Sequence, residues 1–225
     1  MKILSVDTSS KICAVAILEN ENVIKENELN NGLTHSENFM PLLDKTLKEA
    51  NLILDDIDLI SCVVGPGSFT GIRIGVASIK AIAQFKNIPI VSITSLESLA
   101  YNVDQKCDVI CSLIDARNNQ VYCGIFDSNK ELLEDYIADD ILVIIEKLEK
   151  YNNIIFVGDG QEIHGEIIKE KLGKNNIQFS DSNEQNGKSC GLCGYHKYLK
   201  EKDVKNYNTL NPIYLRKSQA ERMKK

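Results

Sequence analysis

The sequence has no tryptophan, only three histidines and only four prolines among its 225 residues. It contains no apolar run of the roughly 20 residues that a membrane-spanning helix needs. Acidic residues outnumber basic ones by 32 to 26, and this net charge of −6 excludes a protein that binds nucleic acid with its whole surface. The histidines His35, His164 and His196 are too scattered to form the His-Glu-x-x-His motif of a metallopeptidase.

The N-terminus and the cysteines both indicate a cytoplasmic chain. Met1-Lys-Ile-Leu-Ser5 leads directly into an apolar run that reads as a strand, so we expect no signal peptide. The number of cysteines is seven, and an odd count without a secretion signal predicts reduced thiols. Four of them lie in apolar runs, where a thiol behaves as a small hydrophobic group: Cys13, Cys62, Cys111 and Cys123.

One cysteine pair has the spacing of metal ligands. Cys190-Gly-Leu-Cys193 is followed by His196, but the chain offers no second Cys/His pair to complete a zinc site. The segment 188–200 also reads as a helix with Leu192, Tyr195 and Leu199 on one side. We therefore interpret this segment as structural and expect no metal site in the chain.

Hydrophobic periodicity predicts alternating strands and helices. In the first half we expect strands over 2–6, 12–18, 22–27, 58–64 and 88–93, with helices from about 34 to 50 and over 72–85. In the second half we expect strands over 109–114, 120–126, 136–138, 154–157 and about 176–180, with helices over 139–148, from 158–160 onward, and over 188–200. Such alternation predicts an α/β fold with mixed, partly parallel sheets.

An internal repeat divides the chain. Val6–Leu18 matches Ile114–Phe126 without a gap, and each copy reads as a strand, an Asp, a polar hairpin and a second strand. The two copies lie about half a chain apart, as expected for a duplicated domain. We expect a first lobe over 1–103, a smaller second lobe over 104–210 and a C-terminal segment over 211–225.

A glycine loop lies at the centre of the first half. Gly65-Pro-Gly-Ser-Phe-Thr-Gly71 joins a predicted strand to a predicted helix, and so much glycine indicates unusual backbone dihedrals. The residues of interest are Gly65, Gly67, Ser68 and Thr70. Backbone N–H groups at the start of such a helix can dock an anion or an acceptor of a partner, although a tight turn without a ligand is equally consistent with the pattern.

The repeated hairpins resemble the phosphate-binding hairpins of the actin and sugar-kinase superfamily. That resemblance implies two lobes of ribonuclease-H-like fold that hold ATP between them. The superfamily hairpins read Asp-x-Gly-(Thr/Ser), whereas Ser9 and Arg117 occupy the glycine positions here. We therefore expect a nucleotide cleft that has lost its phosphate contacts, with its remnants at Asp7, Ser9, Ser10, Asp115, Gly158 and Gly160.

Four longer segments resemble one family, the TsaB (YeaZ) family. They are Ile3-Leu-Ser-Val-Asp-Thr-Ser-Ser10, His35-Ser-Glu37, Val64–Gly75 and Pro212-Ile-Tyr-Leu-Arg-Lys-Ser-Gln-Ala-Glu221. The resemblance implies a subunit in the biosynthesis of threonylcarbamoyladenosine on tRNA that has no catalysis of its own. Its implied partners are the catalytic paralogue TsaD and the ATPase TsaE, while TsaC supplies threonylcarbamoyl-adenylate and tRNA is met only through the complex.

The catalytic paralogue holds a metal with a His-x3-His pattern after the strand equivalent to 88–93. That alignment places Ser95 and Leu99 at the two histidine positions, and neither side chain suits a transition metal. We expect no cofactor, no metal and no catalytic residue in this chain.

Two helices of the first half are the expected partner surface, because the resemblance implies that the family pairs them with their equivalents on TsaD. The predicted interface residues are Ser36, Phe39, Met40, Leu43, Leu47, Gly71, Arg73, Gly75 and Ser78. Small residues at helical spacing permit close helix–helix packing. The same patch can form a homodimer when the partner is absent. We expect Gly75→Trp to prevent pairing and to leave the monomer folded.

Other functions fit the sequence less well. A kinase or ATPase of the same fold is the stronger alternative, although the glycine loop lacks the Gly-Lys-(Ser/Thr) of a P-loop. A glycoprotease-type peptidase is the weaker one, and Gly67-Ser-Phe-Thr-Gly71 also lacks the spacing of a serine hydrolase. The basic residues Arg216, Lys217, Arg222, Lys224 and Lys225 read as a solvated tail that can add a contact to tRNA.

Overall fold

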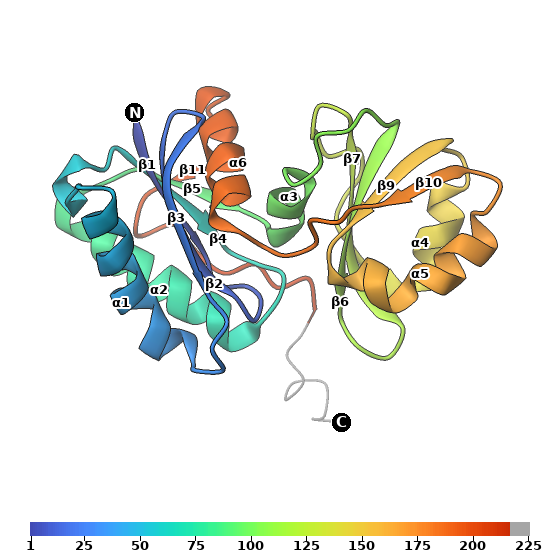
Figure 1. Cartoon of the computed structure of the whole chain (residues 1–225), viewed down its shortest axis with the longest axis horizontal. Helices are drawn as coiled ribbons and strands as arrows, with labels where there is room; N and C mark the ends of the chain where they lie inside the picture. Colours follow the sequence, from blue (N-terminus) through green and yellow to red (C-terminus); the bar gives the residue numbers. More distant parts are fainter. Residues whose placement is uncertain (217–225) are drawn as a thin grey trace. The chain divides into compact units, whose positions relative to one another are not determined.

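The computed structural model describes residues 1–216. The chain divides into two compact units (Figure 1). Unit 1 comprises Met1–Ser98 and Gln185–Ile213, and unit 2 comprises Leu99–Glu184 and residues 214–216. Within the described residues, every helix is too short or too polar to cross a membrane.

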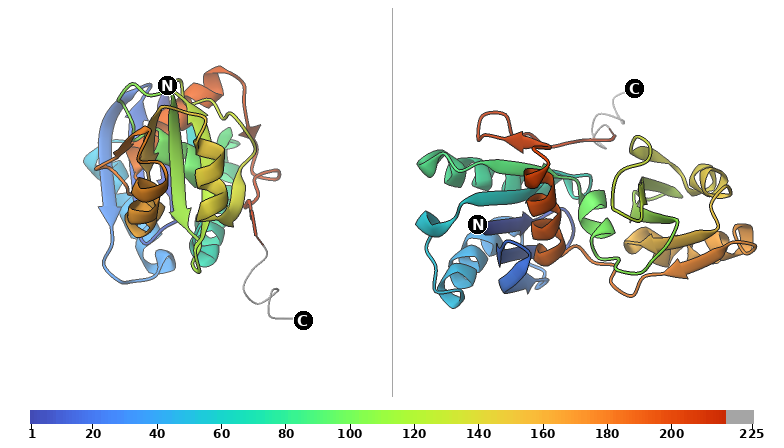
Figure 2. Two further views of the ribbon diagram at one scale, coloured as in Figure 1. Left: turned by 90° about the vertical axis from the view of Figure 1, so that its right-hand side faces the viewer. Right: turned by 90° about the horizontal axis from the view of Figure 1, so that it is seen from above.

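Unit 1 is built on a six-stranded sheet in the order β11-β5-β4-β1-β2-β3. Its strands are β1 (Lys2–Asp7), β2 (Cys13–Glu19), β3 (Asn22–Leu29), β4 (Leu59–Val63), β5 (Ile90–Ile93) and β11 (Val204–Lys205). The first three strands form the predicted antiparallel meander. β4 and β5 extend the sheet in parallel, and β11 pairs antiparallel with β5 at its edge (Figure 2).

Helices cover both faces of this sheet, because its central strands β1, β2 and β4 are buried on both sides. α1 (His35–Glu49) and α2 (Phe69–Lys86) pack on the face that carries Leu4, Val6 and Ile60, and together they form the main core (Figure 1). α6 (Gly187–Leu199) packs on the opposite face, against β1, β2 and β4. Local signals explain where the first two helices begin: Thr34 and Glu37 form a capping box on α1, and the Ser68 side chain accepts a hydrogen bond at the start of α2.

Unit 2 contains a five-stranded sheet in the order β10-β9-β6-β7-β8. Its strands are β6 (Val109–Asp115), β7 (Gln120–Asp127), β8 (Ile137–Asp140), β9 (Asn153–Val157) and β10 (Asn176–Phe179), and α4 (Ile141–Leu148) and α5 (Asp159–Lys171) pack against them. Both units therefore follow the chain order β-β-β-α-β-α-β with equivalent sheet positions. This agreement supports the duplication that the sequence repeat predicted, since β1 and β2 correspond to β6 and β7.

The predicted lobe boundary is wrong for the last part of the chain. We expected 104–210 in the second lobe, but Gln185–Ile213 belongs to unit 1. The physical reason is the small face of α6: a Cβ on Gly187, Gly191 or Gly194 would collide with Ala16, Leu18 or Ser61 of the sheet in unit 1. Ser5 and Ser61 donate hydrogen bonds to the Gly187 and Cys190 carbonyls, at 2.5 and 2.7 Å, and hold the helix there.

The predicted apolar side of this last helix is also wrong. α6 buries small residues, such as Ser189 and Cys193, whereas Leu199 is 62% exposed. Three short elements were not predicted: β11, the 3₁₀ turn η1 (Leu54–Asp56) and α3 (Ser95–Ala100). Their length explains this, because two to six residues do not establish a hydrophobic period.

Candidate functional site

The glycine loop is packed tightly onto the β1–β2 hairpin of unit 1. Gly65 and Gly67 have φ angles of +118° and +150°, a region that favours glycine. A Cβ on Gly67 would overlap the Ser9 carbonyl, and a Cβ on Gly71 would overlap the Thr8 carbonyl. The glycines therefore permit a close approach between the hairpin and the start of α2.

Backbone donors of this loop are used inside the protein. The Ser68 N–H donates to the Ser9 carbonyl at 2.7 Å, and the Gly71 N–H donates to Ser68 Oγ at 3.2 Å. Thr8 Oγ1 in turn donates to the Gly71 carbonyl at 2.8 Å. Of the two interpretations that the sequence left open, these contacts favour a packed turn over an exposed anion cradle.

Asp7, the first hairpin carboxylate, is completely buried. Ser9 donates to Asp7 Oδ1 from its backbone N–H at 2.8 Å and from its hydroxyl at 2.7 Å, whereas Oδ2 has no partner. Burial raises the pKa of Asp7 to about 6, against the Ser9 hydrogen bonds and the nearby His35, which lower it. Ser9, which stands where the superfamily hairpins have glycine, thus donates hydrogen bonds to the carboxylate of its own hairpin. The Ser10 carbonyl accepts a hydrogen bond from His35 Nε2 at 2.9 Å.

The hairpin between β6 and β7 has the left-handed backbone conformation that favours glycine, although no glycine occurs there. Arg117, Asn118 and Asn119 have φ angles of +66°, +54° and +59°. The Asp115 carboxylate accepts from the Arg117 N–H at 3.1 Å, as in a local turn. Arg117, at the position where the hairpins that these resemble carry glycine, therefore combines a left-handed backbone with a long side chain.

Gly158 and Gly160 pack against strand β6 in unit 2. Gly158 has a φ of +104°, and a Cβ added to it would overlap the Leu113 carbonyl. A Cβ on Gly160 would lie 2.9 Å from the Leu113 Cβ. In the duplicated topology this turn, between β9 and α5, corresponds to the glycine loop between β4 and α2. In both turns the glycines allow the start of the following helix to pack closely on a neighbouring strand or hairpin.

Several residues of the predicted partner surface lie in the core. Phe39, Leu43 and Leu47 are 1%, 2% and 8% exposed and pack with the sheet of unit 1. Gly71 and Gly75 are buried against Thr8. The outward residues of the predicted set are Ser36, Met40 and Arg73, with Ser78 half-buried. Gly75→Trp is consequently a poor test of pairing, because the indole would displace Thr8 inside the monomer.

The outward face of α2 contains exposed residues that were not among the predicted interface residues. Ala77 and Ala81 are exposed at a spacing of one helical turn, and Phe85 follows one turn later with 88% of its surface exposed. Arg73 begins this row and lies over the Phe69 ring at 4.2 Å. We call Ala77, Ala81 and Phe85 the α2 outer face. The spacing of Ala77, Ala81 and Phe85 at i, i+4 could have indicated one helix face. The isoleucines that lie between them in the sequence made this face hard to recognise.

Ser95 and Leu99, which we compared with the metal-binding histidines of the catalytic paralogue, are both buried in the protein. The Ser95 hydroxyl donates to the Pro66 carbonyl. Cys190 and Cys193 are buried on α6, and burial raises the pKa of the Cys190 thiol to about 12, so it stays protonated. In the part of the chain that the structure describes, no three His, Cys, Asp or Glu side chains are grouped to hold a metal ion. The basic residues Lys217, Arg222, Lys224 and Lys225 lie outside the described residues.

Comparisons with known proteins identify the family and the fold. The model of the family described as “TsaD: tRNA N6-adenosine threonylcarbamoyltransferase” matches residues 30–224. The “tRNA threonylcarbamoyladenosine biosynthesis protein TsaB” of Bacillus subtilis is 32% identical over 98% of this chain and 96% of its own length. The structure resembles YeaZ from Pseudomonas aeruginosa, with a TM-score of 0.77 and 21% identity over 95% of this chain and all of that one.

A more distant likeness confirms the fold class. The activator of the 2-hydroxyisocaproyl-CoA dehydratase from Clostridium difficile, solved with bound ADPNP, covers 95% of this chain and all of its own, with a TM-score of 0.54 and 11% identity. The duplicated β-β-β-α-β-α-β units thus form the expected actin-like ATPase fold. The matches over nearly the whole chain lead to one conclusion: this chain belongs to the TsaB (YeaZ) family of tRNA threonylcarbamoyladenosine biosynthesis proteins.

Proposed function

We propose that this chain is a non-catalytic subunit that binds and activates the threonylcarbamoyltransferase TsaD. Its match to the family model of that transferase supports the proposal, because it indicates that the chain is related to its proposed partner. Paralogues that keep one fold can pair through equivalent surfaces, as two copies do across a two-fold axis. In the absence of TsaD, the same surface would pair two copies of this chain.

The observation that carries the proposal is the α2 outer face. Phe85 is 88% exposed, and burying such a side chain contributes about 1.5–3 kcal/mol. Ala77 and Ala81 beside it allow the backbone of another helix to approach closely. Met40 of α1, which is 52% exposed, is the proposed contribution of the neighbouring helix.

The lack of catalysis is part of the proposal. The family resemblance places Ser95 and Leu99 at the positions of the transferase's metal-binding histidines, and Ser95 instead donates to the Pro66 carbonyl. The glycine-loop N–H groups of Ser68 and Gly71 are bonded internally. These features leave the subunit to act by organising its partner. A TsaE-like ATPase would join the pair, and tRNA would be bound only by the assembled complex.

Co-purification with TsaD, followed by a tRNA-modification assay, tests the proposal. We expect Ala81→Arg to abolish both co-purification and stimulation of modification, because a charge would be buried in a close helix contact. The matched control is Ile163→Arg on α5, whose side chain is 60% exposed in unit 2, and it should bind as the wild type does.

The alternative function predicts a different result. If the isolated chain hydrolysed ATP and Asp7→Ala abolished that turnover, the chain would be an ATPase of the actin-like fold. Retained binding and stimulation with Ala81→Arg would show instead that the partner uses another surface.

A further inference from the structure

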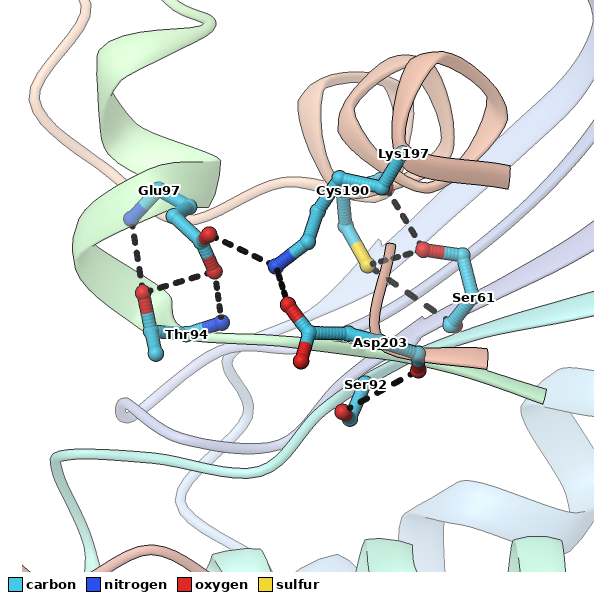
Figure 3. Close-up of polar contacts among 7 residues, drawn as sticks. All are labelled: Ser61, Ser92, Thr94, Glu97, Cys190, Lys197 and Asp203. Carbon is cyan, nitrogen blue, oxygen red and sulfur yellow. Dashed lines mark hydrogen bonds and ion pairs between the residues drawn. The ribbon is translucent and has the colours of Figure 1, made fainter. Parts of the chain in front are cut away.

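A largely buried lysine near the end of α6 connects the chain that follows this helix to α3 (Ser95–Ala100), which is distant in sequence. Lys197 of α6 lies 2.6 Å from Glu97 Oε1 of α3 and 2.7 Å from Asp203 Oδ2, which follows α6 (Figure 3). The Lys197 and Glu97 side chains are only 12% and 16% exposed, whereas Asp203 is 49% exposed. We call these three residues the Lys197 cluster.

The cluster is oriented by further hydrogen bonds. Thr94 donates to Glu97 Oε2 from its backbone N–H at 2.7 Å and from its hydroxyl at 3.0 Å, so Glu97 is fixed before it meets Lys197 (Figure 3). Burial lowers the pKa of Lys197, but the Glu97 carboxylate and the Asp203 hydrogen bond outweigh it and hold that pKa above its ordinary value. Lys197 is therefore a charged anchor whose own side chain is largely removed from solvent.

The segment after α6 is tied to that helix and to β5 by backbone hydrogen bonds. The Glu201 and Lys202 N–H groups donate to the Tyr198 and Lys197 carbonyls, each at 2.9 Å, and the Ser92 N–H donates to the Asp203 carbonyl at 3.2 Å. We call residues 201–206 the strap. All of its residues are exposed except Lys205, which is half-buried, so apolar burial contributes little to its position. Its strand, β11, pairs only Val204 and Lys205 with β5.

Backbone strain weakens the strap further. Glu201 and Asp203 have φ angles of +55° and +54°, which cost on the order of 1 kcal/mol each for residues other than glycine. Beyond the strap the chain is anchored again, since Tyr207 packs against the core and Leu210 is fully buried. A segment with exposed residues, short pairing and strain belongs to the low-stability part of a fold.

We propose that the strap is a local lid on the β5 edge of the sheet, held closed by the ion pair between Lys197 and Asp203. When that pair is broken, residues 201–206 leave β5 as one unit, while the chain from Tyr207 onward and the rest of unit 1 stay folded. The Glu97 pair fixes Lys197 in place, and the Asp203 pair closes the lid. This proposal is independent of partner binding.

Amide hydrogen exchange measured by NMR on the full chain tests the lid. The Ser92 N–H donates to the Asp203 carbonyl at 3.2 Å and reports on closure. The Ile213 N–H, bonded to the Val64 carbonyl at 2.8 Å, and the Val64 N–H, bonded to the Ile93 carbonyl at 2.8 Å, report on the rest of unit 1. We expect Lys197→Met and Asp203→Asn to accelerate exchange at Ser92 about tenfold and to change the other two amides less than about twofold.

Two controls separate the lid from general destabilisation. Glu97→Gln keeps the pair that closes the lid and should leave Ser92 exchange near the wild-type rate. Lys188→Met removes an exposed lysine from the same helix and should also have no effect. Asn tolerates the left-handed backbone of Asp203, so Asp203→Asn changes charge without adding strain. Unchanged exchange at Ser92 in both lid variants, or equal acceleration of all three amides, would overturn the proposal.

Discussion

α2 of unit 1 and α5 of unit 2 occupy the same position in two units of the same topology, yet they present different surfaces. The outward residues of α2 include Ala77, Ala81 and Phe85, while those of α5 include Ile163 between the acidic residues Glu162 and Glu166. Both helices begin with glycines that pack on the adjacent strand or hairpin. Duplication has therefore kept the contacts that build each unit, and the surfaces have diverged, which restricts the proposed docking to unit 1.

The buried hairpin carboxylate of unit 1 gives the largest expected effect in this comparison. The folded-state pKa of Asp7 is raised from 3.8 to about 6, so its contribution to stability is complete below the unfolded pKa and is lost as pH rises through about 6. This rise in the pKa of Asp7 corresponds to about 3 kcal/mol in the free energy of unfolding. We expect Asp7→Asn to become more favourable relative to wild type by about this amount between pH 4 and pH 7.5.

Urea unfolding at several pH values measures this difference. Asp115→Asn, at the equivalent position of unit 2, is the matched control and should leave the Asp7-dependent change in place. A constant difference between Asp7→Asn and wild type across this pH range would contradict the burial of a titrating carboxylate.

Two mid-helix glycines sharpen the comparison between α2 and α5. A Cβ on Gly75 would overlap the Thr8 side chain, whereas the nearest atom to a Cβ on Gly165 is a Phe179 ring carbon at 3.8 Å. We expect Gly75→Ala to lower the free energy of unfolding by about 1–3 kcal/mol through overpacking. Gly165→Ala should instead raise it by about 0.5–1 kcal/mol, because alanine favours the helix. Denaturant midpoints with equal m-values would check both signs, and a stabilising Gly75→Ala would be inconsistent with the packing described.

The α2 outer face should be sensitive to the loss of a single aromatic ring. Phe85→Ala is expected to weaken association with TsaD about 10–100-fold, since an exposed anchor would lose its contact area. Ile163→Ala on α5 is the control in unit 2. Titration calorimetry measures both, and an unchanged affinity with Phe85→Ala would remove this residue from the interface.

The smallest expected changes in stability come from substitutions in the β1–β2 hairpin of unit 1 and the β6–β7 hairpin of unit 2. Arg117→Gly should stabilise the protein by about 1 kcal/mol, because glycine relieves the left-handed backbone at φ +66°. Ser9→Gly should destabilise it by about 1 kcal/mol, because the hydroxyl bond to Asp7 is lost. Thermal or urea unfolding of the two variants tests the contrast. The same sign for both would mean that the hairpins have not diverged in the way described.

Much of the fold was predictable because its signals are local or periodic. The three-strand meander, the helices from about residue 34 and after the glycine loop, and the repeat around Asp7 and Asp115 were all predicted, and the structure confirms them. The candidate site was less predictable. Phe39 and Leu43 form an apolar stripe that fits either a core or an interface, and the sequence offers no way to choose between them.

The sequence by itself determined the family, the two-fold repeat and the alternation of strands and helices, because these depend on motifs and short-range periodicity. Only the tertiary structure decided that α6 returns to unit 1, that Gly75 is enclosed by Thr8, and that Lys197 meets Glu97 and Asp203. Those outcomes depend on which small residues let distant segments approach closely. Such complementarity arises from pairs of surfaces and has no period along the chain.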